Sequence, residues 1–148
     1  MISRKAFTLT LLFLNSIGAI FGGYTLIANP DGSGFGIPLS ALQYSPFPDF
    51  LIPGIVLFAT IGIGSFVAFV AVLRSVGAYP WYVIAEGVLL SGWIIIEVLF
   101  LREVAALHLI YLTVGIVLIA LGYNIVSNPT SPQPIHQSPQ PILQKGKS

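Results

Sequence analysis

The sequence contains no cysteine and very few charged residues. Without cysteine it can form no disulfide, thiolate metal site, iron–sulfur cluster or cysteine nucleophile. Charged residues are 7% of the 148 and hydrophobic residues 55%, whereas a water-soluble domain has about a quarter charged residues. A net charge of +1 gives no field that would attract nucleic acid. The composition therefore excludes an ordinary soluble domain and predicts a chain within a lipid bilayer, with no nucleic-acid partner.

Long apolar runs dominate what remains. They cover residues 7–28, 50–73, 81–101 and 104–123, and each has about the 20 residues that a helix needs to cross a bilayer. Helices are expected because they satisfy their own backbone hydrogen bonds in lipid. The first run is longer than the core of a secretory signal and has no convincing cleavage site, so we expect it to be retained. The sequence thus predicts an all-α, polytopic membrane protein, an antiparallel bundle of four transmembrane helices within residues 1–126.

The placement of basic residues predicts the orientation of this bundle. Lys and Arg near helix ends are retained on the cytoplasmic side during insertion. With the N-terminus inside, five basic residues are inside and one is outside: Arg4, Lys5, Arg74, Lys145 and Lys147 against Arg102. We therefore expect a multi-pass membrane protein with both termini in the cytoplasm.

The last 22 residues, 127–148, differ in composition from the rest. They hold five of the eleven prolines and two nearly identical heptapeptides, which begin at Ser131 and Ser138. Such a segment cannot bury a core, so we predict an extended, disordered tail rich in Pro, Gln and Ser. A docking peptide for a partner with a binding groove is the alternative.

Three ionisable residues fall inside the apolar runs, where an isolated charge is costly and usually finds a partner. Two of them, Glu97 and His108, lie on either side of a very tight predicted turn and therefore at equal depth. Asp49 and Arg102 lie just above that level and are candidates to join them. The cluster could be a structural clamp, a proton or ligand site, or a metal site with one histidine and two carboxylates. With a single histidine, the metal alternative is the weakest.

The third ionisable residue, Glu86, lies at a depth that matches Asn15 and Ser16 of the first run and Ser65 of the second. Hydrogen bonds among them would allow Glu86 to be neutral. The group could hold the helices together as packing contacts, or it could be a proton or substrate site. Eleven positions separate Glu86 from Glu97, a rise of about 16 Å. That is too far for two carboxylates to act on one bond.

Small residues recur at a spacing of four in three of the runs. The pairs are Gly18 and Gly22, Gly64 and Ala68, and Gly87 and Ser91. This spacing lets two helices approach closely. In a chain with four spans, we expect the close contacts within the bundle rather than between two copies.

The entry to the second run has a distinctive sequence, Ser-Pro-Phe-Pro-Asp-Phe-Leu-Ile-Pro-Gly at residues 45–54. Arg74, Trp81 and the segment Gly-Trp-Ile-Ile-Ile-Glu at residues 92–97 follow it. Over residues 7–123, the chain resembles a group of small uncharacterised bacterial four-helix membrane proteins. The resemblance implies the four-helix architecture and a bacterial inner membrane, and it implies no catalytic residue.

Three functions remain open, and we favour the first. The first is a structural or accessory protein, which would act through its tail or through a membrane-protein partner or second copy. This hypothesis predicts a dry, closed bundle with Glu97 paired to His108. A small transporter or permeation component predicts a water-accessible cavity that reaches Glu86 or Glu97. A membrane-embedded enzyme predicts a polar pocket that joins Asp49, Glu97 and His108. No motif indicates a cofactor, a resident metal or a catalytic residue, and none is expected.

Overall fold

A computed structural model describes residues 3–128, which form helices and turns and, in that part of the chain, no β-strand. Four helical spans are long and apolar enough to cross a membrane, which confirms the predicted all-α, polytopic membrane fold. The second span has three successive parts, the middle one a π-helix. In chain order the helices are α1 Arg4–Ala28, α2 Leu51–Val56, η3 Leu57–Ile63, α3 Gly64–Leu73, α4 Tyr79–Leu101 and α5 Ala106–Ser127. The predicted tail lies, from residue 129 on, outside the described residues.

Three helices extend beyond their predicted bounds, among them α4, which begins at Tyr79 instead of residue 81. α1 begins at Arg4 instead of residue 7, since the Ser3 hydroxyl accepts a hydrogen bond from the Ala6 amide at 3.1 Å. α5 starts two residues late and ends four residues late, at Ser127. Its last turn bonds back to α1, where Arg4 Nη1 donates to Asn124 Oδ1 at 2.8 Å. Apolar length predicts the part of a helix that is in the membrane, and these polar turns lie beyond it.

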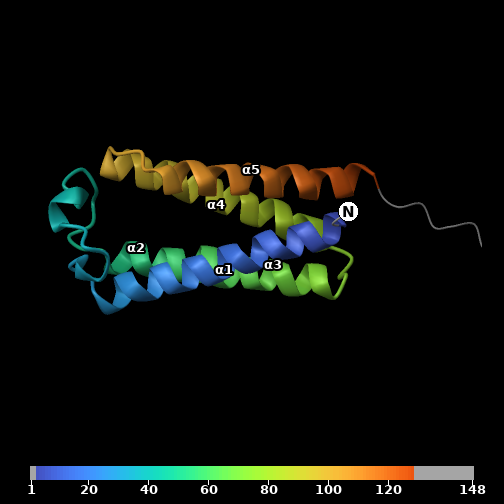
Figure 1. Ribbon diagram of the computed structural model, residues 1–148, viewed down its shortest axis with the longest axis horizontal. Helices are drawn as coiled ribbons and strands as arrows, with labels where there is room; N and C mark the ends of the chain where they lie inside the picture. The colour runs from blue at the N-terminus through green and yellow to red at the C-terminus, as the bar shows by residue number, and fades with distance from the viewer. Residues whose placement is uncertain (1–2, 129–148) are drawn as a thin grey trace, which may run out of the picture.

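The four spans form two helical hairpins arranged as two layers (Figure 1). One layer is α1 with the α2–η3–α3 span, and the other is α4 with α5. The layers meet at the end of the bundle that holds the N-terminus, here called the N-terminal end, and they separate toward the opposite, loop end. A core cluster fills the junction at the N-terminal end: Leu12, Ala68, Val72, Val83 and Leu118.

The hairpin of α4 and α5 is held by direct backbone contact at small residues. A Cβ added to Gly87 would lie 2.6 Å from the Gly115 carbonyl oxygen, and one added to Gly122 would lie 2.8 Å from the Pro80 oxygen. Ser91 also belongs to the contact between Gly87 and Gly115, since a Cβ on Gly115 would collide with the Ser91 hydroxyl. The predicted use of Gly87 and Ser91 for close packing within the bundle therefore agrees with the structure.

The other hairpin packs α1 against the π-helical segment η3. A Cβ on Gly23 would lie 2.6 Å from the Phe58 nitrogen, so only glycine fits there. Ser16 Oγ donates to the Gly62 carbonyl at 2.9 Å, which fixes η3 beside α1. π-helical turns are rare and often occur near functional sites. Here η3 supplies Leu57 and Ile61 to the wall of the cavity described below.

The connection between α1 and α2 covers the loop end. It contains two short 3₁₀ helices, η1 Ser33–Phe35 and η2 Leu39–Leu42. The Asp31 carboxylate accepts hydrogen bonds from the Ser33 hydroxyl at 2.6 Å and the Ser33 amide at 3.0 Å. These bonds lower the pKa of Asp31 from its ordinary value. Leu42 is buried with Leu26 and Phe50, so the loop is attached to the end of the first hairpin.

Candidate functional site

A cavity of about 670 Å³ lies between the two layers, where they separate toward the loop end. α1, the α2–η3 span, α4, the start of α5 and the covering loop all contribute to its wall. Most lining side chains are apolar, and many are aromatic: Phe21, Phe35, Phe47, Phe50, Trp93, Phe100 and Tyr111. Asn15, Glu97, Glu103 and His108 are the polar exceptions among the described lining residues. The site is therefore an apolar space with a few converging polar groups.

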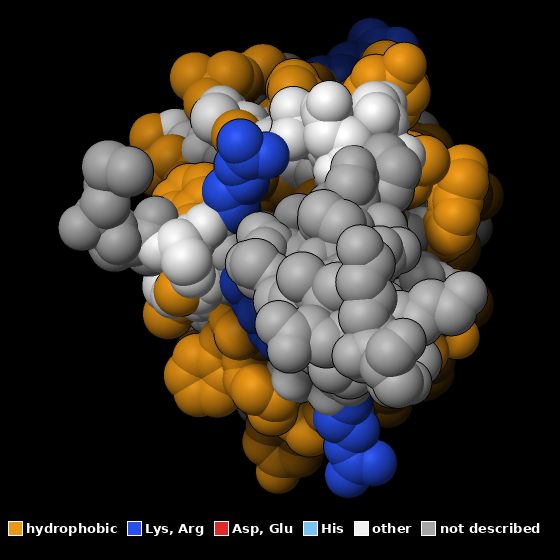
Figure 2. Space-filling view, turned by 90° about the vertical axis from the view of Figure 1, so that its right-hand side faces the viewer, with side chains coloured by type: hydrophobic (Ala, Val, Ile, Leu, Met, Phe, Trp, Pro, Cys, Tyr) orange, Lys and Arg blue, Asp and Glu red, His pale blue; other side chains and the backbone are white. Residues whose placement is uncertain are grey.

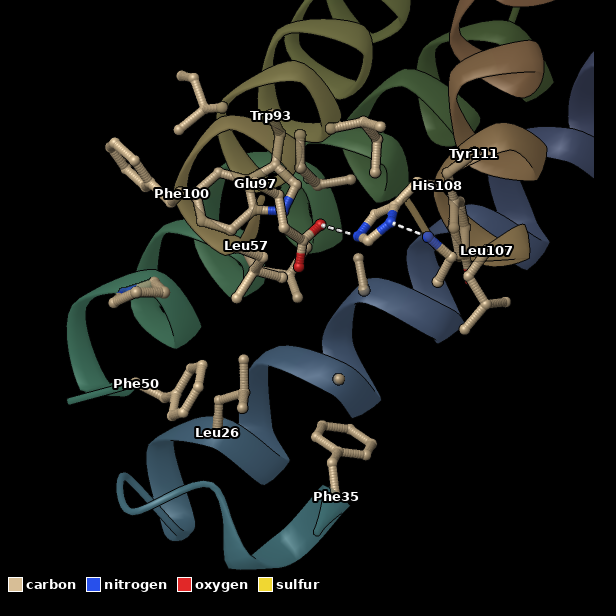
Figure 3. A pocket seen from close by; sticks show the side chains of 18 of the residues that line it. Leu26, Phe35, Phe50, Leu57, Trp93, Glu97, Phe100, Leu107, His108 and Tyr111 are labelled. Atoms are coloured by element: carbon tan, nitrogen blue, oxygen red, sulfur yellow. Dashed lines mark hydrogen bonds and ion pairs between the residues drawn. The ribbon is translucent and has the colours of Figure 1, made fainter. Parts of the chain in front are cut away.

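Glu97 and His108 lie side by side on the wall of this cavity (Figure 3). Nε2 of His108 is 3.8 Å from Oε2 of Glu97, a separation longer than a hydrogen bond. The side chains are 31% exposed for Glu97 and 13% for His108. The structure thus brings the predicted pair together at equal depth, in loose contact and facing open space.

The second ring nitrogen of His108 is already engaged. Nδ1 accepts a hydrogen bond from the Ala105 amide at 2.9 Å, at the start of α5. A nitrogen that accepts a hydrogen bond carries no proton, so the ring proton is on Nε2, on the side of Glu97. His108 therefore presents Nε2 to Glu97, at a distance longer than a hydrogen bond.

Asp49 and Arg102 do not join this pair, because their side chains have other partners. Asp49 Oδ1 accepts from the Leu51 amide at 3.0 Å and so caps α2. Arg102 ends α4 in a left-handed conformation, with φ of 50°. Its guanidinium carbon lies 4.0 Å from the centre of the Tyr44 ring in the covering loop. Neither residue lines the cavity, so the pair of Glu97 and His108 forms the site without them.

The other predicted cluster is a buried chain of hydrogen bonds. Asn15 Nδ2 donates to Ser65 Oγ at 2.7 Å, and Ser65 Oγ donates to Glu86 Oε1 at 2.5 Å. The three residues are 3%, 0% and 2% exposed. Asn15 Oδ1 is buried and has no hydrogen-bond partner among residues 3–128. Because Asn15 also lines the cavity, this chain joins its deepest point to Glu86.

Several lining residues were not identified from the sequence. For one of them, Tyr111, a signal existed: it follows His108 by three positions and so shares a face of α5. A Cβ on Gly18 of α1 would lie 2.8 Å from Tyr111 Oη, which makes this the point where α1 approaches α5. Phe35 belongs to the covering loop, whose path over the cavity no helical periodicity describes.

In the described part of the chain, no three His, Cys, Asp or Glu side chains are grouped closely enough to hold a metal ion. Compared with protein-family models, with curated proteins and with solved structures, the chain matches none of them. The function is therefore argued from the cavity and its residues.

Proposed function

We propose that this protein binds an apolar small molecule inside the membrane, as a small transporter or permeation component. The observation that carries the proposal is the cavity of about 670 Å³ with Glu97 on its wall. Pockets for small ligands have volumes of roughly 300–1,000 Å³ and are mostly apolar, with a few placed polar groups. This cavity has both properties.

The packing of the bundle supports a carrier that is open on one side. At the N-terminal end the layers are closed by Leu12, Val83 and Leu118, all 0% exposed. At the loop end the layers separate and leave the cavity. A site that is open toward one side and closed toward the other is what an alternating-access transporter presents in one of its states.

The way in lies between α1 and α5. These helices contact each other far less than α4 and α5 do. Phe21 of α1 and Leu107 of α5 both line the cavity, and both are largely exposed, at 65% and 63%. An opening flanked by exposed apolar side chains admits a molecule from the lipid rather than from water.

The proposed location is the bacterial inner membrane, with both ends of the chain in the cytoplasm. Supporting this orientation, the N-terminal end gathers Arg4, Lys5 and Arg74, while no acidic residue is found on the corresponding segments. Figure 2 looks onto this end, and its visible surface carries Lys and Arg side chains but none of Asp or Glu. The cavity would then face the outer leaflet.

Binding of the neutral dye Nile red to the purified, full-length protein tests the proposal. Gly22 lines the cavity, and a Cβ there would meet only Leu57, at 3.5 Å. Gly22→Leu should therefore fill space that the ligand needs and weaken binding by at least about tenfold. Gly92→Leu is the matched control, because a Cβ on Gly92 would meet nothing within 4 Å and Gly92 is not a lining residue. Fluorescence titration in an uncharged detergent measures both.

Two results would contradict the proposal. One is wild-type protein that gives no more dye fluorescence than empty micelles. The other is equal binding by the wild-type, Gly22→Leu and Gly92→Leu proteins, because the dye would then lie on the outer surface.

The accessory function stays a second candidate, favoured by the surface of α5. Only 17% of the apolar window of α5 is buried within the described bundle, against 28–33% for the other spans. A membrane-protein partner or a second copy of the chain would pack there, as small-domain membrane proteins often require. Light scattering of the detergent-solubilised protein tests the second-copy form, and a strictly monomeric protein would exclude it.

A further inference from the structure

We infer that the molecule bound in this cavity is a lipophilic cation, such as an organic ammonium or phosphonium ion. The inference rests on the proposed function and adds the chemical class of the ligand. It depends on three observations: the open carboxylate of Glu97, the absence of positive charge in the cavity wall, and the aromatic residues around it.

The Glu97 carboxylate has no Lys or Arg partner among residues 3–128. Its one polar neighbour is the imidazole of His108, at 3.8 Å through Oε2 and so beyond hydrogen-bonding distance. Oε1 has no hydrogen bond from any residue in 3–128, and Figure 3 shows the carboxylate directed into the space between the layers. A carboxylate inside a membrane is stabilised by a partner of opposite charge. A bound cation supplies that partner.

No basic side chain is available to bind an anion instead. The described lining residues include no Lys or Arg. Arg102, the nearest in sequence, is stacked on Tyr44 of the loop. A second carboxylate, that of Glu103, is on the rim near the turn between α4 and α5. The wall therefore presents negative charge and hydrogen-bond acceptors, which disfavour a fatty acid or a phosphate headgroup.

The aromatic residues suit a delocalised or alkylated cation. Trp93 lies one turn before Glu97 on α4, beside the carboxylate, and Tyr111 lies one turn after His108 on α5, on the far side of the imidazole from Glu97 (Figure 3). Phe35 and Phe50 lie across the cavity from it. A cation within about 6 Å of an aromatic ring is attracted by the negative face of that ring. Apolar rings with one carboxylate bind a cation that does not require water around it.

An isosteric pair of ions isolates the effect of charge. Tetraphenylphosphonium and tetraphenylborate have nearly the same size and shape and opposite charges. We would titrate each into the full-length Trp81→Phe protein in an uncharged detergent. Trp93 is then the single tryptophan, because the sequence has two. Quenching of Trp93 fluorescence reports binding, and micelles without protein give the baseline for partition.

The wild-type cavity should bind the cation at least about tenfold more tightly than the anion. Glu97→Gln keeps the shape of the side chain and removes its charge, so this preference should disappear while Nile red still binds. Asp31→Asn is the control. It changes the net charge of the protein by the same amount, but Asp31 is an exposed loop residue bonded to Ser33. The preference should survive this change.

The outcomes separate the inference from the function on which it rests. Nile red binding with equal affinities for the two ions overturns the cation inference and leaves the binding function standing. Loss of the preference in Asp31→Asn as well as in Glu97→Gln also overturns it, because the effect would come from net charge. Absence of Nile red binding overturns both. The comparison of the two ions on the Trp81→Phe protein does not require the Glu97→Gln change, so a Glu97→Gln protein that fails to fold does not prevent the test.

Discussion

At the scale of single residues, two glutamates on one helix have different surroundings. Glu86 is 2% exposed and accepts a short hydrogen bond from Ser65. Glu97, further along α4, faces an open cavity, and its nearest polar neighbour is beyond hydrogen-bonding distance. Glu86 is therefore joined through Ser65 to α3 and, through Asn15, to α1. Glu97 faces the space in which we propose that a ligand binds.

The chain of Asn15, Ser65 and Glu86 leads to a prediction about stability. Ser65→Ala removes both the donor to Glu86 and the acceptor for Asn15, so two buried polar groups lose a partner. Each such loss costs about 1–3 kcal/mol. The variant should unfold at a clearly lower temperature than wild type in detergent.

A hydroxyl on the surface of the bundle provides the control. Thr113 is exposed and bonds only to the Leu109 carbonyl of its own helix. Thr113→Val should therefore change the unfolding temperature little. If Ser65→Ala and Thr113→Val have equal effects, the buried chain does not contribute to stability and Glu86 is held in some other way.

The depth of these residues could be predicted from the sequence, but their partners could not all be predicted. Rise per residue places Glu97 level with His108, and the structure brings the two together. The same rule places Asp49 and Arg102 near them. Asp49 instead caps α2, and Arg102 stacks on Tyr44. A nearby backbone amide binds Asp49 and an aromatic ring contacts Arg102. Counting residues along a helix predicts neither of these interactions.

At the scale of elements, apolar length identified all four spans, and polar caps determined their ends. The break of the second span into α2, η3 and α3 was not predicted. Its residues are apolar apart from Thr60 and Ser65, so a change from α-helical to π-helical bonding leaves no trace in the hydropathy pattern. The contacts of Gly23 in α1 with Phe58 and of Gly62 in η3 with Ile20, seen only in three dimensions, accompany that change.

Substituting alanine for each of two glycines on α4 should change the stability of the protein in opposite directions. A Cβ at Gly87 would lie 2.6 Å from a carbonyl oxygen of α5, whereas one at Gly92 would meet nothing within 4 Å. Gly87→Ala must push α4 away from α5, and overpacking of this kind costs about 1–3 kcal/mol. Gly92→Ala should be neutral or stabilising, because alanine favours the helix by up to about 1 kcal/mol.

Thermal unfolding in detergent should therefore order the proteins as Gly87→Ala, wild type and Gly92→Ala, from least to most stable. The reverse order of the two variants would show that α4 and α5 are not in backbone contact at Gly87. It would also remove the rigid hairpin on which Glu97 and His108 are brought together.

At the scale of the whole molecule, the cavity results from how the two hairpins are inclined to each other. Each hairpin is packed along its length, by Gly87 in one and by Gly23 in the other. Buried clusters pack the hairpins together at the N-terminal end and further along the bundle, where Ala19 and Ile61 meet Leu90 and Ile94. Beyond these clusters the layers separate toward the loop end. Inclination is a property of side-chain packing between distant segments. For this reason the sequence indicated the four spans and the two acids but not the space in front of Glu97.

The direction in which the cavity faces can be measured with introduced cysteines, since the chain has none of its own. Ser33 is exposed in the covering loop, and Gly77 is exposed in the turn between α3 and α4 at the N-terminal end. With both termini in the cytoplasm, a membrane-impermeant maleimide should label Ser33→Cys in intact bacterial cells. Gly77→Cys should be labelled only after the membrane is permeabilised.

The physical cause of this orientation can be tested on the same two reporters. Arg4, Lys5 and Arg74 lie at one end, against Arg102 with Glu103 at the other, and it is the basic residues that are retained on the cytoplasmic side. Neutralising all three with Ser or Gln should leave the four spans apolar and inserted, but the orientation should become mixed. A fraction of Gly77→Cys should then be labelled in intact cells. Full labelling of Gly77→Cys before any charge is changed would mean that the bundle is inverted, so that the cavity opens toward the cytoplasmic leaflet and takes its ligand from there.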